Sequence, residues 1–156
     1  MKLYIRQKVF SFTDRFSIFD QDGQPKYWAE GELFSLAKRL HVSDVSGEEV
    51  ITIEQELLSF VARYRVLYKR IPFALIRQRL SLTPSFEIEG PGWEVKGSFF
   101  GHDFTIYDDQ TVIAHISKQW MRWGDSYEID IVDEVNELPI LAIVLGIDAA
   151  AARSKG

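Results

Sequence analysis

The chain has 156 residues, of which 46% are hydrophobic and 26% charged, a composition typical of a folded globular domain and not of a disordered or fibrous chain. Its 18 lysines and arginines and its 23 aspartates and glutamates give a net charge of −5. This charge excludes electrostatic binding of nucleic acid or an anionic membrane over the whole surface of the protein. The lack of cysteine excludes disulfides, thiolate metal sites and thiol nucleophiles. The length of the chain is typical of one domain, so we expect residues 1–156 to form a single domain. We also expect a cytoplasmic protein, because the N-terminal segment lacks the apolar stretch of a secretory signal.

Strand signals dominate most of the chain. Short runs rich in Val, Ile, Tyr, Phe and Thr recur about every ten residues and are separated by Asp, Gly, Pro and Ser, as in sandwiches and barrels. The segment Asp20–Gly23 is expected to close a hairpin, because its glycine tolerates positive φ and its aspartates accept backbone hydrogen bonds. Twelve strands are predicted, over residues 3–9, 16–20, 26–31, 36–43, 49–56, 64–69, 74–82, 86–89, 93–99, 104–107, 112–118 and 127–132.

The last segment has a different pattern and predicts a helix over residues 137–153. Asn136 is expected to be its N-cap, and Pro139 lies in its first turn. The apolar stretch is shorter than the roughly 20 residues that cross a bilayer, so no transmembrane segment is predicted. We expect a core helix that contributes Leu138, Ile140, Leu141, Val144, Leu145 and Asp148.

A helix that is apolar on all sides has to be surrounded by protein. A sheet of many strands can satisfy this requirement, and remove its own edges, by closing around the helix. The predicted fold class is therefore mostly β: a closed or nearly closed barrel of about twelve strands threaded by the C-terminal helix. Asp148 then needs a partner such as Lys38 or Lys118, or a position where the helix leaves the barrel, because a buried carboxylate is costly. A ligand in the barrel mouth is the alternative.

Segments in both halves of the sequence resemble a known family. Segments 27–44, 47–50, 53–55 and 58–59 resemble the N-terminal half of the LURP-one-related family, and 113–118, 123–131 and the apolar terminal helix with Asp148 resemble its C-terminal half. The resemblance is to a short member of the bacterial type. It implies the tubby C-terminal-like fold, which is a twelve-stranded barrel around a hydrophobic helix. The family is also similar to phospholipid scramblases. Because tubby domains bind phosphoinositides, it also implies an anionic phospholipid as a candidate ligand, although no stretch matches the lipid-contacting residues of tubby.

One third of the basic residues lie in a short segment without acids. Strand alternation would place several of them on one outer face if a hairpin ran through residues 71–73. Such a face suits a phosphate or an acidic lipid headgroup, and the alternative is a solvated wall that pairs with acids elsewhere. This basic group consists of Arg63, Arg65, Lys69, Arg70, Arg77 and Arg79.

No catalytic residue, metal site or cofactor is predicted. His41, His102 and His115 lack the spacing that metal sites use, and Asp20–Gly23 lacks the later acidic ligand of a calcium loop. The leading interpretation is a non-catalytic binding or scaffolding module that presents its outer wall to an anionic lipid, a phosphate or a protein partner, with contact at the membrane periphery left open. The alternatives are a hydrolase-type enzyme with a site at the barrel rim and, least favoured, a DNA-binding regulator.

Overall fold

The computed structural model describes residues 1–5, 15–32, 36–79, 85–98, 103–121 and 124–155. This part of the chain forms twelve strands, a short 3₁₀ helix over Glu134–Asn136 and one long helix, α1 (Glu137–Lys155). The strands are β1 (Lys2–Ile5), β2 (Arg15–Phe19), β3 (Pro25–Gly31), β4 (Arg39–Ser43), β5 (Glu49–Gln55), β6 (Arg63–Tyr68), β7 (Ile71–Arg79), β8 (Ser85–Glu89), β9 (Trp93–Ser98), β10 (Asp103–Asp108), β11 (Thr111–Met121) and β12 (Gly124–Ile131).

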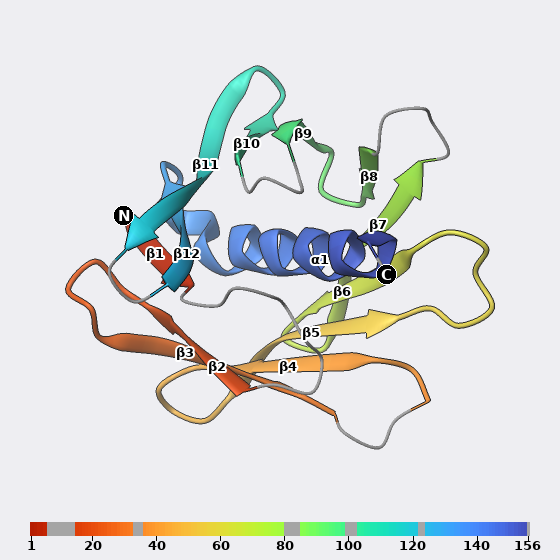
Figure 1. Cartoon of the computed structure of the whole chain (residues 1–156), viewed down its shortest axis with the longest axis horizontal. Helices are drawn as coiled ribbons and strands as arrows, with labels where there is room; N and C mark the ends of the chain where they lie inside the picture. Colours follow the sequence, from red (N-terminus) through yellow and green to blue (C-terminus); the bar gives the residue numbers. More distant parts are fainter. Residues whose placement is uncertain (6–14, 33–35, 80–84, 99–102, 122–123, 156) are drawn as a thin grey trace.

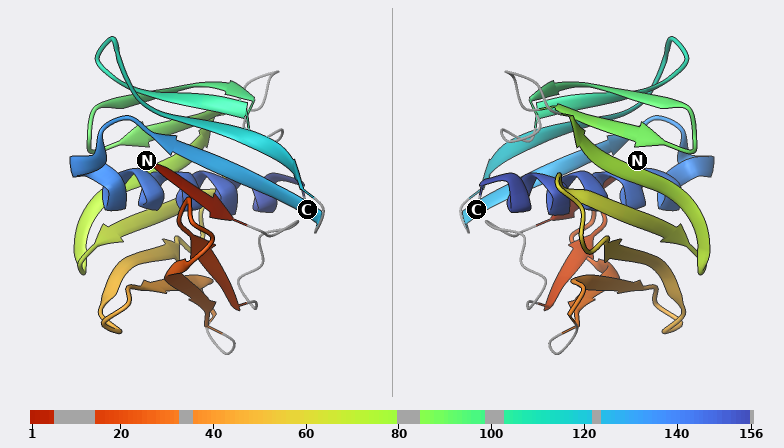
Figure 2. Two further views of the ribbon diagram at one scale, coloured as in Figure 1. Left: turned by 90° about the vertical axis from the view of Figure 1, so that its left-hand side faces the viewer. Right: turned by 90° about the vertical axis from the view of Figure 1, so that its right-hand side faces the viewer.

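All strands belong to one antiparallel sheet that curls around α1 (Figures 1 and 2). Its order is β8-β7-β6-β5-β4-β3-β2-β1-β12-β11-β10-β9, so the first strand of the chain pairs with the last and joins the two halves. Among the described residues no ladder connects β8 to β9, which are the two edges of the sheet. The molecule is therefore a nearly closed barrel with one open seam, the gap between β8 and β9.

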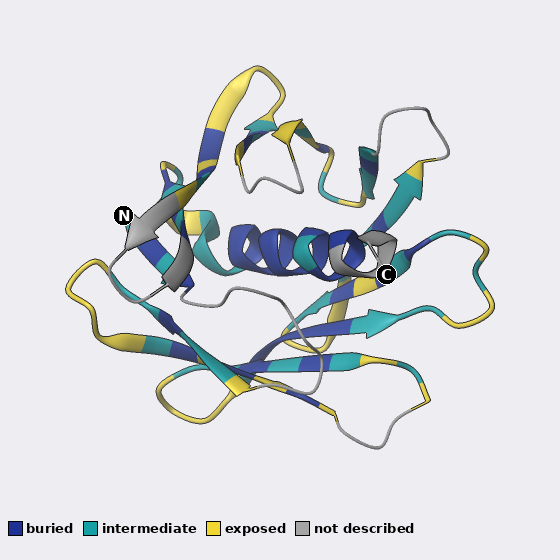
Figure 3. Ribbon diagram, viewed as in Figure 1, coloured by how far each residue is buried: buried dark blue, intermediate teal, exposed yellow. Residues whose placement is uncertain are grey.

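The interior of the barrel is occupied by α1 (Figure 3). Ile140, Leu141, Val144 and Leu145 are at most 1% exposed, while Leu138 is half-buried. The helix packs mainly against β5, β6 and β7. In the part of the chain that the structure describes, no helix is both long enough and apolar enough to cross a bilayer.

A glycine allows the close contact between α1 and the wall. A Cβ atom on Gly146 would overlap the Cδ1 of Ile76 on β7 and lie 3.0 Å from the Cγ2 of Val66 on β6. Both of these side chains are completely buried. The missing methyl group of Gly146 thus sets how near the helix axis can approach the sheet.

The predicted fold class, with its twelve strands and its terminal helix, is confirmed, and so is the Asp20 hairpin, where Asp20 Oδ1 accepts the amides of Asp22 and Gln24 at 2.9 Å. The turn expected at residues 71–73 is wrong. The chain reverses at Lys69 and Arg70, whose φ angles are 50° and 67°. Pro72 lies inside β7 beside a register shift in the pairing with β6, where a residue without an amide hydrogen is tolerated.

The helix α1 begins at Glu137, as predicted, but the expected N-cap is wrong. A 3₁₀ segment, Glu134–Asn136, directly precedes α1, so Asn136 lies inside this segment instead of capping α1. Its side-chain amide donates to Asp133 Oδ2 at 2.7 Å. Glu137, the first residue of α1, accepts hydrogen bonds from Lys26 Nζ at 2.5 Å and from Tyr27 Oη at 2.6 Å. These contacts tie the start of the helix to β3.

Asp148 has the partner that a carboxylate in an apolar helix requires. Tyr127 on β12 donates its hydroxyl hydrogen to Asp148 Oδ2 at 3.1 Å. Burial raises the pKa of Tyr127 well above its usual value, and the charge of Asp148 adds to this effect. The neutral phenol is therefore a stable hydrogen-bond donor to Asp148.

Candidate functional site

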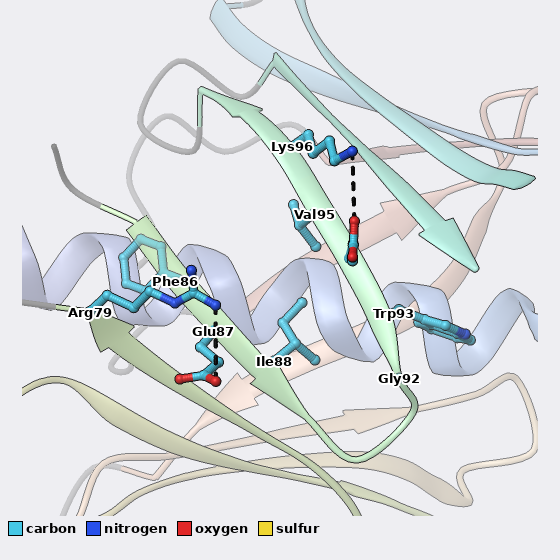
Figure 4. A pocket seen from close by; sticks show the side chains of 9 residues that line it. Arg79, Phe86, Glu87, Ile88, Gly92, Trp93, Val95 and Lys96 are labelled. Carbon is cyan, nitrogen blue, oxygen red and sulfur yellow. Dashed lines mark ion pairs between the residues drawn. The ribbon is translucent and has the colours of Figure 1, made fainter. Parts of the chain in front are cut away.

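The seam between β8 and β9 contains a hollow of about 470 Å³ (Figure 4). The two strands are close together at the connection Gly90–Gly92 and diverge away from it, with α1 lying behind them (Figure 4). This seam hollow is lined by Arg79, Phe86, Glu87, Ile88, Gly92, Trp93, Glu94, Val95 and Lys96. Its volume lies in the range of pockets that hold ligands.

Two glycines, one on each side of the seam, allow close backbone contact with the neighbouring strands. Gly90 has φ +122°, and a Cβ atom there would overlap the carbonyl oxygen of Phe73 on β7. Gly97 has φ +130°, and a Cβ atom there would overlap the carbonyl oxygen of Asp103 and lie 2.7 Å from the Cα of Phe104 on β10. Only glycine combines such φ angles with such close backbone contact. Gly90 thus lies against β7 and Gly97 lies against β10, so the two edge strands stay close to their outer neighbours on either side of the seam.

The inner side of the seam hollow is apolar. Phe86 and Trp93 are buried, and Ile88 and Val95 are half-buried. The ring of Trp93 meets that of Phe73 edge to face, with 5.8 Å between the ring centroids, a favourable aromatic geometry. Phe86 and Trp93 belong to the same buried core cluster as the side chains of α1, so the inner side of the hollow is part of the core.

The outer rim of the seam hollow carries balanced charge. Arg77 donates to Glu87 Oε2 at 2.5 Å and lies 3.0 Å from Glu89. Arg79 lies 3.9 Å from Glu87. The hydrogen bond from Arg77 lowers the pKa of Glu87 and raises that of Arg77. On the other strand Lys96 lies 3.7 Å from Glu94 (Figure 4). Each acid at this rim therefore has a cation beside it.

The six residues of the basic group lie on β6, on β7 and in the turn between them. Arg63 is opposite Arg77 in the β6–β7 ladder, and Lys69 and Arg70 form the turn at one end. Of the six, Arg79 alone lines the seam hollow. The strands bring the group onto one wall, where acids of the neighbouring strands lie between its members.

These acids are near enough to pair with the basic group. Glu56 lies 3.2 Å from Arg63 and 3.9 Å from Arg65, and Glu54 lies 3.6 Å from Arg65. Glu49 lies 3.9 Å from Arg70. Among the described residues, Lys69 is the one member of the group without a carboxylate within 4 Å; its ammonium lies 5.7 Å from the centroid of the Tyr68 ring. The sequence analysis gave pairing with acids as its alternative, but it could not name the partners, because they depend on strand register.

The histidines do not converge. His41 on β4 contacts Glu49 through Nδ1 and lies 3.0 Å from Glu32 through Nε2. Burial opposes protonation of His41, but these two carboxylates outweigh it and raise the pKa of His41. His115 Nδ1 lies 2.8 Å from the Thr105 hydroxyl, and His102 lies outside the described residues. No cluster of His, Cys, Asp or Glu that could hold a metal ion occurs in the described ranges.

The sequence analysis also missed most of the seam residues. It predicted strands over residues 86–89 and 93–99, and it could not show that the described parts of these two strands form no ladder with each other. The available signal was the pair of short, glycine-flanked strands around Gly90–Gly92. That signal becomes specific only when β8 and β9 are known to be the two ends of the sheet.

The fold and the seam define a nearly closed, twelve-stranded antiparallel barrel around one helix. The chain belongs to the LURP-one-related family, whose sequence model matches residues 1–148. It is 35% identical over 149 residues to the uncharacterized protein YxjI of Bacillus subtilis (strain 168), covering 95% of this chain and 92% of that protein. The fold is similar to the X-ray structure of an Arabidopsis thaliana protein, AT5G01750, with a TM-score of 0.59 and 17% identity over 92% of this chain and 88% of that one.

Proposed function

We propose that this protein is a non-catalytic binding module that uses the outer surface of its barrel to bind a protein partner. The observation that carries this proposal is the position of the seam hollow. Because α1 fills the interior, a ligand has to approach from outside, and the seam hollow offers both apolar and charged groups there. A surface that mixes an apolar centre with a charged rim is typical of protein interfaces.

A module for anionic lipid or phosphate is the second candidate, and the basic group favours it. The carboxylates beside five of the six basic side chains weaken this candidate, because each pair reduces the field available to a ligand. Lys69 and Arg70, which project from the turn and are exposed, are the part of the group that best suits an anion.

The enzyme and DNA alternatives receive less support. A rim site of a hydrolase needs a nucleophile, a base and an orienting group within hydrogen-bond distance of one another. His41 and His115 lie on different strands, and each already contacts side chains of its own wall. DNA binding needs a basic surface of one sign, whereas this wall alternates arginine with glutamate.

A vesicle cosedimentation experiment separates the first two candidates. We expect no salt-sensitive binding to vesicles that contain anionic phospholipid. Binding that is lost when Arg65, Lys69, Arg70 and Arg77 are changed to Glu would replace the protein partner with an anionic ligand. The matched control changes Lys2, Arg15, Lys38 and Lys118 to Glu, which alters the net charge equally but leaves the basic group intact.

The protein partner is tested by photo-crosslinking in cells. A photoreactive amino acid replaces Lys96, which is exposed at the seam hollow, and in a control chain it replaces Val135, which is 93% exposed beside α1. We expect a discrete protein adduct from position 96 and none from position 135. Equal adducts from both positions, or none from either, would contradict the proposal.

A further inference from the structure

We propose that the seam hollow binds an extended segment of the partner protein, which adds to the sheet as a further strand along the edge of β9 that faces away from β10. This inference rests on the proposed function and specifies how the partner binds. The segment that fits has apolar residues alternating with uncharged polar ones. Backbone pairing, apolar contact and charge balance each support it.

The backbone argument starts from the sheet order. β9 pairs with β10 along its whole length, from Ser98 opposite Asp103 to Trp93 opposite Asp108, and the described residues place no strand on its other side. β8 likewise pairs with β7. An edge strand presents alternate amide and carbonyl groups outward, which is the surface that another strand matches best. Addition of an extended peptide to such an edge is an established type of recognition.

The edge of β9 is more accessible than that of β8. Four of its six residues, Glu94, Lys96, Gly97 and Ser98, are exposed. In β8 Phe86 is buried, and Glu89 is the only exposed residue. Gly97 also has no side chain to obstruct an approaching backbone. The guest strand is therefore less obstructed along β9 than along β8.

The side chains of the seam hollow specify the composition of the guest strand. Alternate residues of a strand point to opposite faces of the sheet. Those that point inward would meet Ile88 and Val95, which are apolar and half-buried. Those that point outward would meet the charged side chains of the hollow, where the cations Arg79 and Lys96 lie beside the acids Glu87 and Glu94. A balanced rim best matches uncharged polar residues such as threonine and serine.

The test begins with a display library of random peptides selected against the intact protein. Enriched peptides are synthesised, and their dissociation constants are measured for the wild type and for Val95→Lys. This substitution places an inward charge at the edge, a device that natural edge strands use against pairing. The matched control is Val112→Lys, since Val112 is an exposed valine of a strand, two strands along the sheet. We expect Val95→Lys to weaken binding at least about tenfold and Val112→Lys to have little effect.

A second measurement does not depend on whether Val95→Lys folds. Methylation of alternate backbone nitrogens of the peptide removes the donors of one strand edge and leaves the side chains unchanged. We expect methylation on one edge to abolish binding and methylation on the other edge to be tolerated. Amide hydrogen exchange of the wild type should show new protection at alternate residues of Trp93–Ser98 when the peptide is bound.

The outcomes also separate this inference from the proposed function. Binding that tolerates methylation of either edge, or protection of amides outside β9, would overturn strand addition and leave a protein-binding module intact. Failure to enrich any peptide would overturn strand addition as well, while the crosslinking experiment would still decide the proposed function. Loss of binding in both valine variants would overturn the location at the seam.

Discussion

The two sides of the barrel solve the same packing problem differently. On one side β5, β6 and β7 lie directly against α1, with Val66 and Ile76 completely buried beside Gly146. On the other side Phe86 and Trp93 are buried, and the described parts of β8 and β9 form no ladder with each other. One side of the sheet is thus held to the helix by close packing. At the seam, buried side chains stand where the described strands form no ladder.

This difference separates stability from recognition. Close-packed contacts between a helix and a sheet tolerate little change, because interiors have few voids and the loss of one methyl group affects stability. Edge strands with half-buried side chains belong to the less stable part of a fold, from which binding surfaces are usually drawn. We expect the contacts of α1 with β5, β6 and β7 to contribute most to the free energy of unfolding, and substitutions at the seam to lower it only slightly.

The largest effect should come from truncating the core helix. Leu141 is completely buried, so Leu141→Ala should lower the free energy of unfolding by about 2–5 kcal/mol. Val95 is half-buried at the seam hollow, and Val95→Ala should lower it by less than about 1 kcal/mol. Denaturant unfolding of both variants measures the difference. Similar losses would mean that the seam is as tightly packed as the wall and would remove the contrast.

An intermediate effect is expected where α1 touches the wall. Gly146→Ala gains up to about 1 kcal/mol of helix propensity, but the new methyl group overlaps Ile76 Cδ1. Overpacking costs about 1–3 kcal/mol, and Ile76 and Val66 are too buried to move aside. We expect a net loss of about 1 kcal/mol. Ile76→Val removes the overlapping atom, so the double variant should be more stable than the sum of the single effects predicts.

The control for this coupling is Ile129→Val, which makes the same change at an equally buried residue of β12. Its effect should add to that of Gly146→Ala, because distant and independent sites are additive. Additivity at Ile76 as well would show that the contact of Gly146 with β7 does not limit the approach of the helix.

The sequence predicts the elements of this fold better than the way in which they close. Twelve strands and the terminal helix follow from local alternation and from the uniform apolarity of residues such as Leu141 and Val144. The open seam does not follow, because it depends on the distance between the two ends of a long sheet. The glutamates beside Arg65 and Arg77 are distant in sequence, and strand register alone brings them near. The position of the turn was mistaken because Pro72 resembles a turn signal but occupies a register shift in β7.

The smallest effect should be that of pH on the free energy of unfolding, acting through His41 on the outer face of β4. Its contacts with Glu32 and Glu49 raise its pKa in the folded protein above the value of 6.5 that is usual for an exposed histidine. This contribution to stability is therefore fully present below about pH 6.5 and is lost as the pH rises through the higher pKa of the folded state. Because His41 is partly exposed to solvent, the contribution should stay below about 1 kcal/mol.

The free energies of unfolding of the wild type and His41→Gln should therefore differ more at about pH 6 than at about pH 8.5. In a chain that carries Glu32→Gln and Glu49→Gln, the same histidine substitution should change the pH dependence much less, since the carboxylates that stabilise the imidazolium are gone. A difference that grows with pH would reverse the sign and mean that His41 is stabilised in its neutral form. Burial would then control the protonation of His41 on the outer face of β4. The contrast between a packed inner face of the sheet and an outer face stabilised by charge pairs would no longer hold.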